Sequence, residues 1–153
     1  LVIPATTDVN KLIARYVGED SDNTLNFFFS TYQSIEVVSA FQKFAQCKFK
    51  EISGIEKRVN DFQMVDKGSQ YFRNETGSGY EAFLSSDELI RMKLYFQRRH
   101  IIEHNTGIVD QKYIDNSGDN DYSVGQRIVV KTCEALDLIT IIKKLSSGIC
   151  TLI

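Results

Sequence analysis

Apolar residues recur along most of this chain at the three- and four-residue spacing of an amphipathic helix. The pattern is clearest from about Ser21 or Asp22 onward, where further aromatic residues widen the apolar stripe. A stripe of this width predicts a central helix that buries one whole face. Its members are Leu25, Phe28, Tyr32, Ile35, Val38, Phe41 and Ala45.

Further segments have the same periodicity and are also predicted to be helices. They are residues 9–17, a segment that starts at the capping-box sequence SGIE of residues 53–56, one that starts after Ser85 with Gly107 at its end, and a last one from about Thr132. The periodicity therefore predicts an all-α fold, a small up-and-down helical bundle of about five helices.

A polar loop is predicted between the last two helices, at residues 115–125, DNSGDNDYSVG. The RIVV that follows could be a short extended piece. The aspartates of the loop suggest a calcium site, but neither register places glycine and glutamate where an EF-hand loop needs them. We therefore interpret the segment as a solvated turn.

Length and composition are those of an ordinary globular domain. The 153 residues are expected to form one domain over residues 1–153, and because the chain opens with Leu1 it could be the C-terminal part of a longer protein. The formal net charge of -2 argues against sequence-blind binding of a polyanion over the whole surface. A local basic site is still compatible with it.

The cysteines indicate a reducing cellular compartment and do not form the pattern of a disulfide framework or a thiolate metal site. Cys47, Cys133 and Cys150 are widely spaced and each lies among apolar residues, so we expect three buried, reduced thiols in the cytoplasm. No apolar run is long enough to cross a bilayer, and no membrane partner is expected.

The sequence RRHIIEHNTG, residues 98–107, concentrates the chemistry of the chain. At about 100° per residue, Arg99, His100, Glu103 and His104 share one face of the fourth predicted helix. Charged groups on a helix that is otherwise fit for burial are costly unless they are paired or used. This face is therefore the candidate functional site.

The same residues contain His-x-x-Glu-His, a pattern of zinc hydrolases. Two histidines and one glutamate would still need a third protein ligand. The chain has no other histidine, Glu134 is the only glutamate after His104, and Arg99 would repel a dication. We therefore expect no metal and no cofactor.

A metal-free interpretation fits better. Arg99 and His104 form an Arg-x(4–6)-His motif, Arg98 satisfies the same motif with a longer spacing, and the motif lies within FQRRHIIEHNTGIVDQKYI, residues 96–114. This segment, followed by a polar loop and VGQRIVV, resembles one branch of the HEPN superfamily. The resemblance is strongest from about Tyr80 onward.

The resemblance implies a metal-independent endoribonuclease that acts as a homodimer, with the motif helices of two copies facing each other across one composite cleft. His104 would be the acid/base, Arg99 would hold the scissile phosphate, and His100 would assist. Asn105 and Arg98 would bind the substrate. The partners implied are RNA, a second copy of the chain, and an antitoxin or regulatory partner if the protein is a toxin or defence effector.

A second hypothesis is structural. Arg99 and Glu103 stand at i and i+4 and could form an ordinary helix ion pair, leaving both histidines as structural polar groups. Many HEPN domains serve as non-catalytic protein-interaction or nucleotide-binding modules, so the resemblance is compatible with this alternative as well.

Overall fold

The computed structural model describes the backbone of residues 21–152 and the side chains of residues 30–152. Within these residues the secondary structure is helical, apart from one isolated antiparallel bridge between Ile108 and Arg127. The all-α prediction is therefore confirmed. The helix predicted for residues 9–17 lies outside the described residues.

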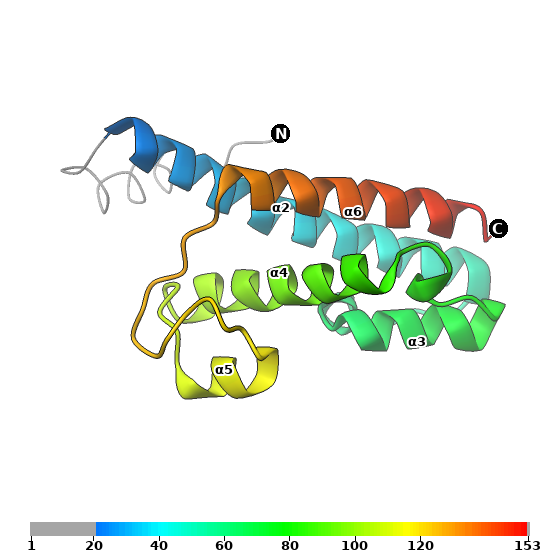
Figure 1. Cartoon of the computed structure of the whole chain (residues 1–153). Coiled ribbons are helices and arrows are strands. Elements are labelled where there is room, and N and C mark those ends of the chain that lie inside the picture. Colours follow the sequence, from blue (N-terminus) through cyan, green and yellow to red (C-terminus); the bar gives the residue numbers. More distant parts are fainter. Residues whose placement is uncertain (1–20, 153) are drawn as a thin grey trace.

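Three long helices form the body of the bundle (Figure 1). α2, Ser21–Ser53, and α6, Thr132–Cys150, lie side by side and run in the same direction, while α4, Ser86–His104, runs the opposite way and packs against both. Val38, Phe41 and Ala45 of the apolar stripe predicted for α2 are buried in the core. Phe41 packs edge-to-face on Phe96 of α4, with ring centroids 6.1 Å apart.

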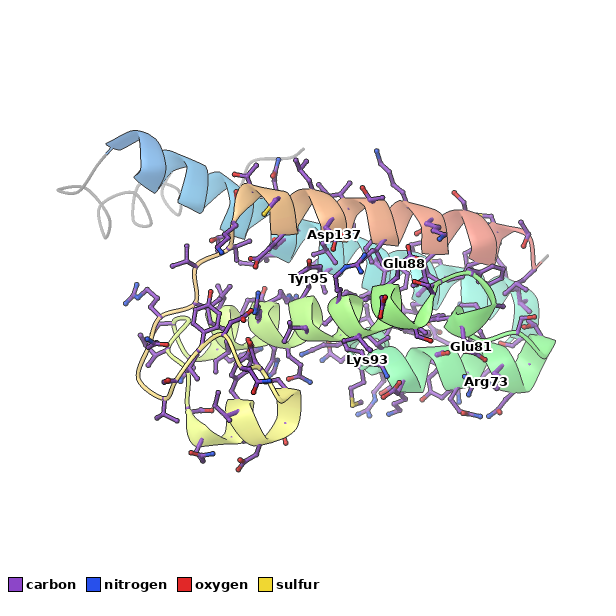
Figure 2. The ribbon with its side chains drawn as sticks, in the orientation of Figure 1. Arg73, Glu81, Glu88, Lys93, Tyr95 and Asp137 are labelled. Atoms are coloured by element: carbon purple, nitrogen blue, oxygen red, sulfur yellow. The ribbon has the colours of Figure 1, made fainter. Side chains whose placement is uncertain are left out.

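Polar contacts fix α4 against α6 as well (Figure 2). The Tyr95 hydroxyl donates to Asp137 Oδ2 at 2.7 Å, and Arg91 Nε donates to the same oxygen at 2.8 Å. Further along, Lys144 Nζ pairs with Glu88 Oε1 at 2.8 Å. These contacts set the rotation of α4, and hence the direction in which its C-terminal half presents its side chains.

A second, smaller core supports the C-terminal end of α4. It consists of Ile101, Val109, Tyr113 and Ile128. Tyr113 belongs to α5, Gln111–Ser117, so the polar loop predicted for residues 115–125 in fact begins with the end of a helix. This core connects the last turn of α4 to α5 and to the extended residues that follow the loop.

The predicted start of the third helix is wrong. Ser53 ends α2, and Gly54 follows it in the left-handed region at φ 72° with its N–H bonded to the Lys50 carbonyl. The chain then passes through the 3₁₀ helix η1, Val59–Gln63, and α3 begins at Val65, extending over Val65–Thr76. The short 3₁₀ helix η2, Tyr80–Ala82, precedes α4.

The prediction of buried cysteines is also wrong. Cys47, Cys133 and Cys150 are all exposed. Cys150 directly follows Ile149, which is completely buried, and the step of about 100° per residue carries the thiol off the buried face. Apolar neighbours in sequence therefore did not indicate the side to which these side chains point. None of the described helices could span a membrane.

Candidate functional site

Both ends of the helix that carries the motif are fixed by local hydrogen bonds. The predicted cap at the start of α4 is confirmed: Ser85 Oγ accepts from the Glu88 N–H at 3.2 Å, and Glu88 Oε1 accepts from the Ser85 N–H at 3.0 Å. At the other end, Gly107 adopts φ 78° and donates to the Ile101 carbonyl at 3.0 Å. The motif thus occupies the last turns of a well-defined helix.

His100 and His104 form a pair of exposed imidazoles on one face of α4. Their ring centroids are 4.5 Å apart and the rings are tilted by 48°. A third side chain joins them, because Gln63 Nε2 lies 2.6 Å from His100 Nδ1. An amide NH₂ can only donate, so Nδ1 is the acceptor and the proton of the neutral His100 ring is on Nε2.

The surroundings of His100 favour its neutral form. Partial burial lowers the pKa of the His100 imidazole below its usual value, and the positive charges of His104, Arg99 and Lys112 lower it further, against the opposing effect of Glu103. At neutral pH, His100 therefore presents an N–H donor at Nε2 while Gln63 holds its other nitrogen.

Arg99 lies on the buried side of this face. The residue is 8% exposed, and its Nη2 contacts Glu103 Oε2 at 3.1 Å and Ser39 Oγ of α2 at 3.0 Å. Its Nε is buried without a hydrogen-bond partner. A buried donor without an acceptor carries a free-energy penalty of about 1–3 kcal/mol, so the guanidinium is only partly satisfied within the single chain.

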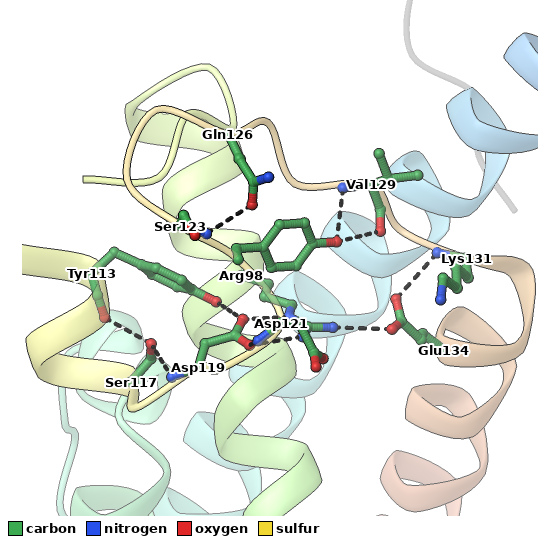
Figure 3. A network of polar contacts seen from close by, with 11 residues as sticks. Arg98, Tyr113, Ser117, Asp119, Asp121, Ser123, Gln126, Val129, Lys131 and Glu134 are labelled. Atoms are coloured by element: carbon green, nitrogen blue, oxygen red, sulfur yellow. Dashed lines mark hydrogen bonds and ion pairs between the residues drawn. The ribbon is translucent and has the colours of Figure 1, made fainter. Parts of the chain in front are cut away.

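Arg98 belongs to a different environment, shown in Figure 3. It is 4% exposed, its Nε donates to Asp119 Oδ2 at 3.0 Å, and further bonds join it to Asp121 at 2.8 Å and to Glu134 at 3.0 Å. Tyr113 also donates to Asp119, at 2.6 Å. This arginine therefore links α4 to the loop after α5 and to α6.

Asp119 is the carboxylate that is most deeply enclosed in this network. Burial by itself would raise the pKa of the Asp119 carboxyl, but the hydrogen bonds from Arg98 and Tyr113 outweigh burial and hold that pKa below its usual value. The pair is thus ionised and mutually neutralising. On the helical wheel Arg98 lies roughly 200° from His100, so the structure does not bring Arg98 together with the histidine pair.

Asn105 ends α4 next to the histidines. Its Nδ2 donates to the Ile108 carbonyl at 2.7 Å, which closes the turn in which Thr106 adopts φ 53°. The side chain is exposed but has this local structural contact. Of the residues proposed from the sequence, the structure groups Arg99, His100, His104 and Asn105 at one end of α4 and places Arg98 elsewhere.

Two contributors could not be read from the sequence. Gln63 comes from η1 and Ser39 from α2, and both are remote from the motif along the chain. Neither forms part of a pattern that would single it out. Within the described residues, no group of three or more His, Cys, Asp or Glu side chains is arranged to hold a metal ion.

Comparisons of the chain with protein-family models, with curated proteins and with solved structures found no match. The resemblance to HEPN domains is therefore an expectation drawn from the sequence from about Tyr80 onward, and a function is inferred below from the site itself.

Proposed function

We propose that this chain is a metal-independent endoribonuclease of the HEPN type, which acts as a homodimer through Arg99, His100 and His104. One observation carries the proposal: two exposed imidazoles lie 4.5 Å apart, next to a buried arginine whose guanidinium is only partly paired. Imidazole exchanges protons near neutral pH, and a guanidinium stabilises the negative charge of a phosphate, so together they supply what RNA cleavage needs.

The reaction uses the nucleophile that RNA itself contains. His104 takes the proton of the ribose 2′-hydroxyl, the 2′-oxygen attacks phosphorus, and the bond from phosphorus to the 5′-oxygen breaks. The leaving 5′-oxygen receives its proton from His104 of the second copy. The products are a 2′,3′-cyclic phosphate and a 5′-hydroxyl, so no metal-bound water takes part.

The other two residues stabilise the phosphate. His100, with its Nδ1 held by Gln63, directs an N–H donor from Nε2 toward solvent and can bond a phosphate oxygen. Arg99 adds positive charge beside the reacting phosphate once a phosphate competes with Glu103 for its guanidinium. An activity of this kind would suit a toxin or defence effector that is restrained by an antitoxin or regulatory partner.

A second candidate function is a non-catalytic module that binds a protein or a nucleotide. The contacts of Arg99 favour it, because the i, i+4 bond to Glu103 and the bond to Ser39 give this arginine an ordinary structural role. This candidate predicts that the pure wild-type dimer cuts no RNA.

The experiment compares RNA cleavage by the wild type and by His104→Ala, each with and without excess EDTA. The proposal expects unchanged wild-type cleavage in EDTA, cyclic-phosphate ends, and a loss of at least about a hundredfold in the variant. Glu75→Ala, on the exposed surface of α3, is the matched control and should retain full activity. Full cleavage by His104→Ala would refute the mechanism, and activity lost in EDTA would point to a metal enzyme.

A further inference from the structure

An open groove of about 710 Å³ lies beside α4, between the start of α3 and the loop that follows α5. Its volume is within the range of sites that hold small molecules, about 300–1,000 Å³. No sequence pattern predicts this groove, because its walls come from three segments that are remote along the chain: Gln63–Lys67, Ile90–Gln97 and Asn116–Asp121.

The groove leads to the histidine pair. Lys93 and Gln97 line it, and with His100 and His104 they follow one another at intervals of four, three and four residues, so all four share one face of α4. Gln63 provides a direct link, since it lines the groove and also bonds His100 at 2.6 Å. A ligand in the groove would therefore extend toward the imidazoles.

The lining combines apolar surface with neutral amides. Met64 and Ile90 are large apolar residues that are 53% and 63% exposed. Both residues therefore offer apolar surface for contact with a group bound in the groove. The amide side chains in the lining, which both donate and accept hydrogen bonds, are Gln63, Gln97, Asn116 and Asn120.

The charges at the groove do not suit an extended polyanion. Lys93 is paired with Asp66 at 2.7 Å, and Asp121 at the loop is 72% exposed in its side chain. Lys67 also lines the groove, but it is paired with Asp61 at 2.8 Å. With both lysines paired and the carboxylates Asp66, Asp119 and Asp121 in the lining, the groove can hold a single phosphate at its edge but would repel a backbone that ran along its floor. The occupant that suits this lining is a flat, uncharged group with a hydrogen-bonding edge.

We propose that this groove holds a nucleobase of single-stranded RNA, adjacent to the phosphate that lies at His100 and His104, and that it thereby selects the sequence at the cut site. Bases of single-stranded RNA are recognised by contact with their faces and hydrogen bonds to their edges. Here Met64 and Ile90 contact the face, Gln63 and Gln97 contact the edge, and Lys93 binds the adjoining phosphate. The proposal rests on the ribonuclease function proposed above.

The test measures binding separately from cleavage. Fluorescence anisotropy of labelled oligo(A), oligo(C), oligo(G) and oligo(U) is recorded with His104→Ala protein, in which the proposed mechanism expects no cleavage during the measurement. Adding Ile90→Ala or Gln97→Ala should weaken the preferred homopolymer by about tenfold and the others less. Adding Lys93→Gln should weaken all four about equally, because a phosphate contact carries no sequence information. Asp66→Asn, which releases Lys93, should strengthen all four.

The inference would be overturned by equal affinity of the groove variants and the Glu75→Ala control for every homopolymer, or by no binding of any homopolymer. A shift of the dimer dissociation constant by Ile90→Ala without RNA, with RNA affinity unchanged, would overturn it too, and would assign the groove to self-association. Groove-dependent binding without cleavage by the wild type would instead refute only the ribonuclease function.

Discussion

At the scale of single residues, two adjacent arginines have different roles. Arg98 and Arg99 both satisfy the spacing of the motif, so the sequence left both as candidates. Arg98 makes its bonds with Asp119, Asp121 and Glu134, whereas Arg99 lies beside the histidines. The carboxylates that bind Arg98 come from a loop and a later helix, and no spacing rule in the sequence predicts that they converge on it.

We predict that Arg98→Ala destabilises the fold by about 3–5 kcal/mol, because it leaves the Asp119 carboxylate, 1% exposed, without its cation. Urea denaturation measures the change. Asp121→Asn is the matched control and should shift stability by less than about 1 kcal/mol, since that side chain is 72% exposed. Unchanged stability of Arg98→Ala together with weaker RNA binding would restore the substrate-binding role suggested by the sequence.

Arg99 gives a prediction that can be tested in cells. Expression of the wild type should arrest growth, and expression of Arg99→Ala should not, because removing one preorganised positive group from such a site lowers the rate by about 10²–10³. Arg99 is buried, so the purified variant must first be shown to unfold cooperatively. Arrest by a folded Arg99→Ala protein would favour a role for this residue in structure alone.

At the scale of elements, the capping-box pattern predicted the start of one helix correctly and the start of another wrongly. Ser85 and Glu88 form the predicted capping box, because a serine and a glutamate three residues apart satisfy each other's backbone groups wherever a helix starts. The same pattern at Ser53 and Glu56 predicted a helix start that the structure does not have, because Gly54 between them adopts the left-handed conformation that ends a helix. A glycine is compatible with both outcomes. In the structure α3 begins instead at Val65, which is buried, as is Phe62 before it.

Two acidic residues near the start of α4 predict a loss of stability in acid. Salt bridging by Arg73 lowers the pKa of Glu81 from 4.5 to about 2, and bonding to Lys144 and Ser85 lowers the pKa of Glu88 likewise to about 2. A carboxyl whose pKa is lower in the folded state than in the unfolded state stabilises the fold at pH values above its unfolded pKa. The stabilisation that these two carboxyls contribute should therefore be complete well above pH 4.5 and be lost as the pH falls from about 4.5 toward 2.

The measurement is urea denaturation at a series of pH values between these limits. Glu88→Gln should flatten part of the acid slope, because the amide does not titrate, and should also lower stability at neutral pH through the loss of the Lys144 ion pair. Glu75→Gln, the same substitution at an exposed position of α3, is the matched control. A slope identical in all three proteins would contradict the assignment.

At the scale of the whole molecule, helical periodicity was enough to predict the bundle, because each amphipathic stripe has to be buried against another. Helical periodicity was not enough to predict the groove or the position of Gln63, because both depend on how η1 and the loop after α5 pack against α4. The site was thus predictable as a face of one helix but not as a three-dimensional arrangement. Long-range contacts supply the difference.

The composite site makes a kinetic prediction that a single-chain site does not. One copy contributes only one His104, and Arg99 is partly engaged by Glu103, so an isolated chain lacks the second proton-transfer group that the proposed reaction uses. If only the dimer cuts RNA, then at protein concentrations well below the dimer dissociation constant the dimer concentration follows the square of total protein. Halving the protein concentration should then lower the cleavage rate about fourfold rather than twofold.

Light scattering coupled to size exclusion measures the dimer dissociation constant independently. Adding excess His104→Ala protein should suppress cleavage by the wild type, because mixed dimers form. A rate that stays proportional to protein down to concentrations at which the chain is monomeric would show that one copy of α4 suffices.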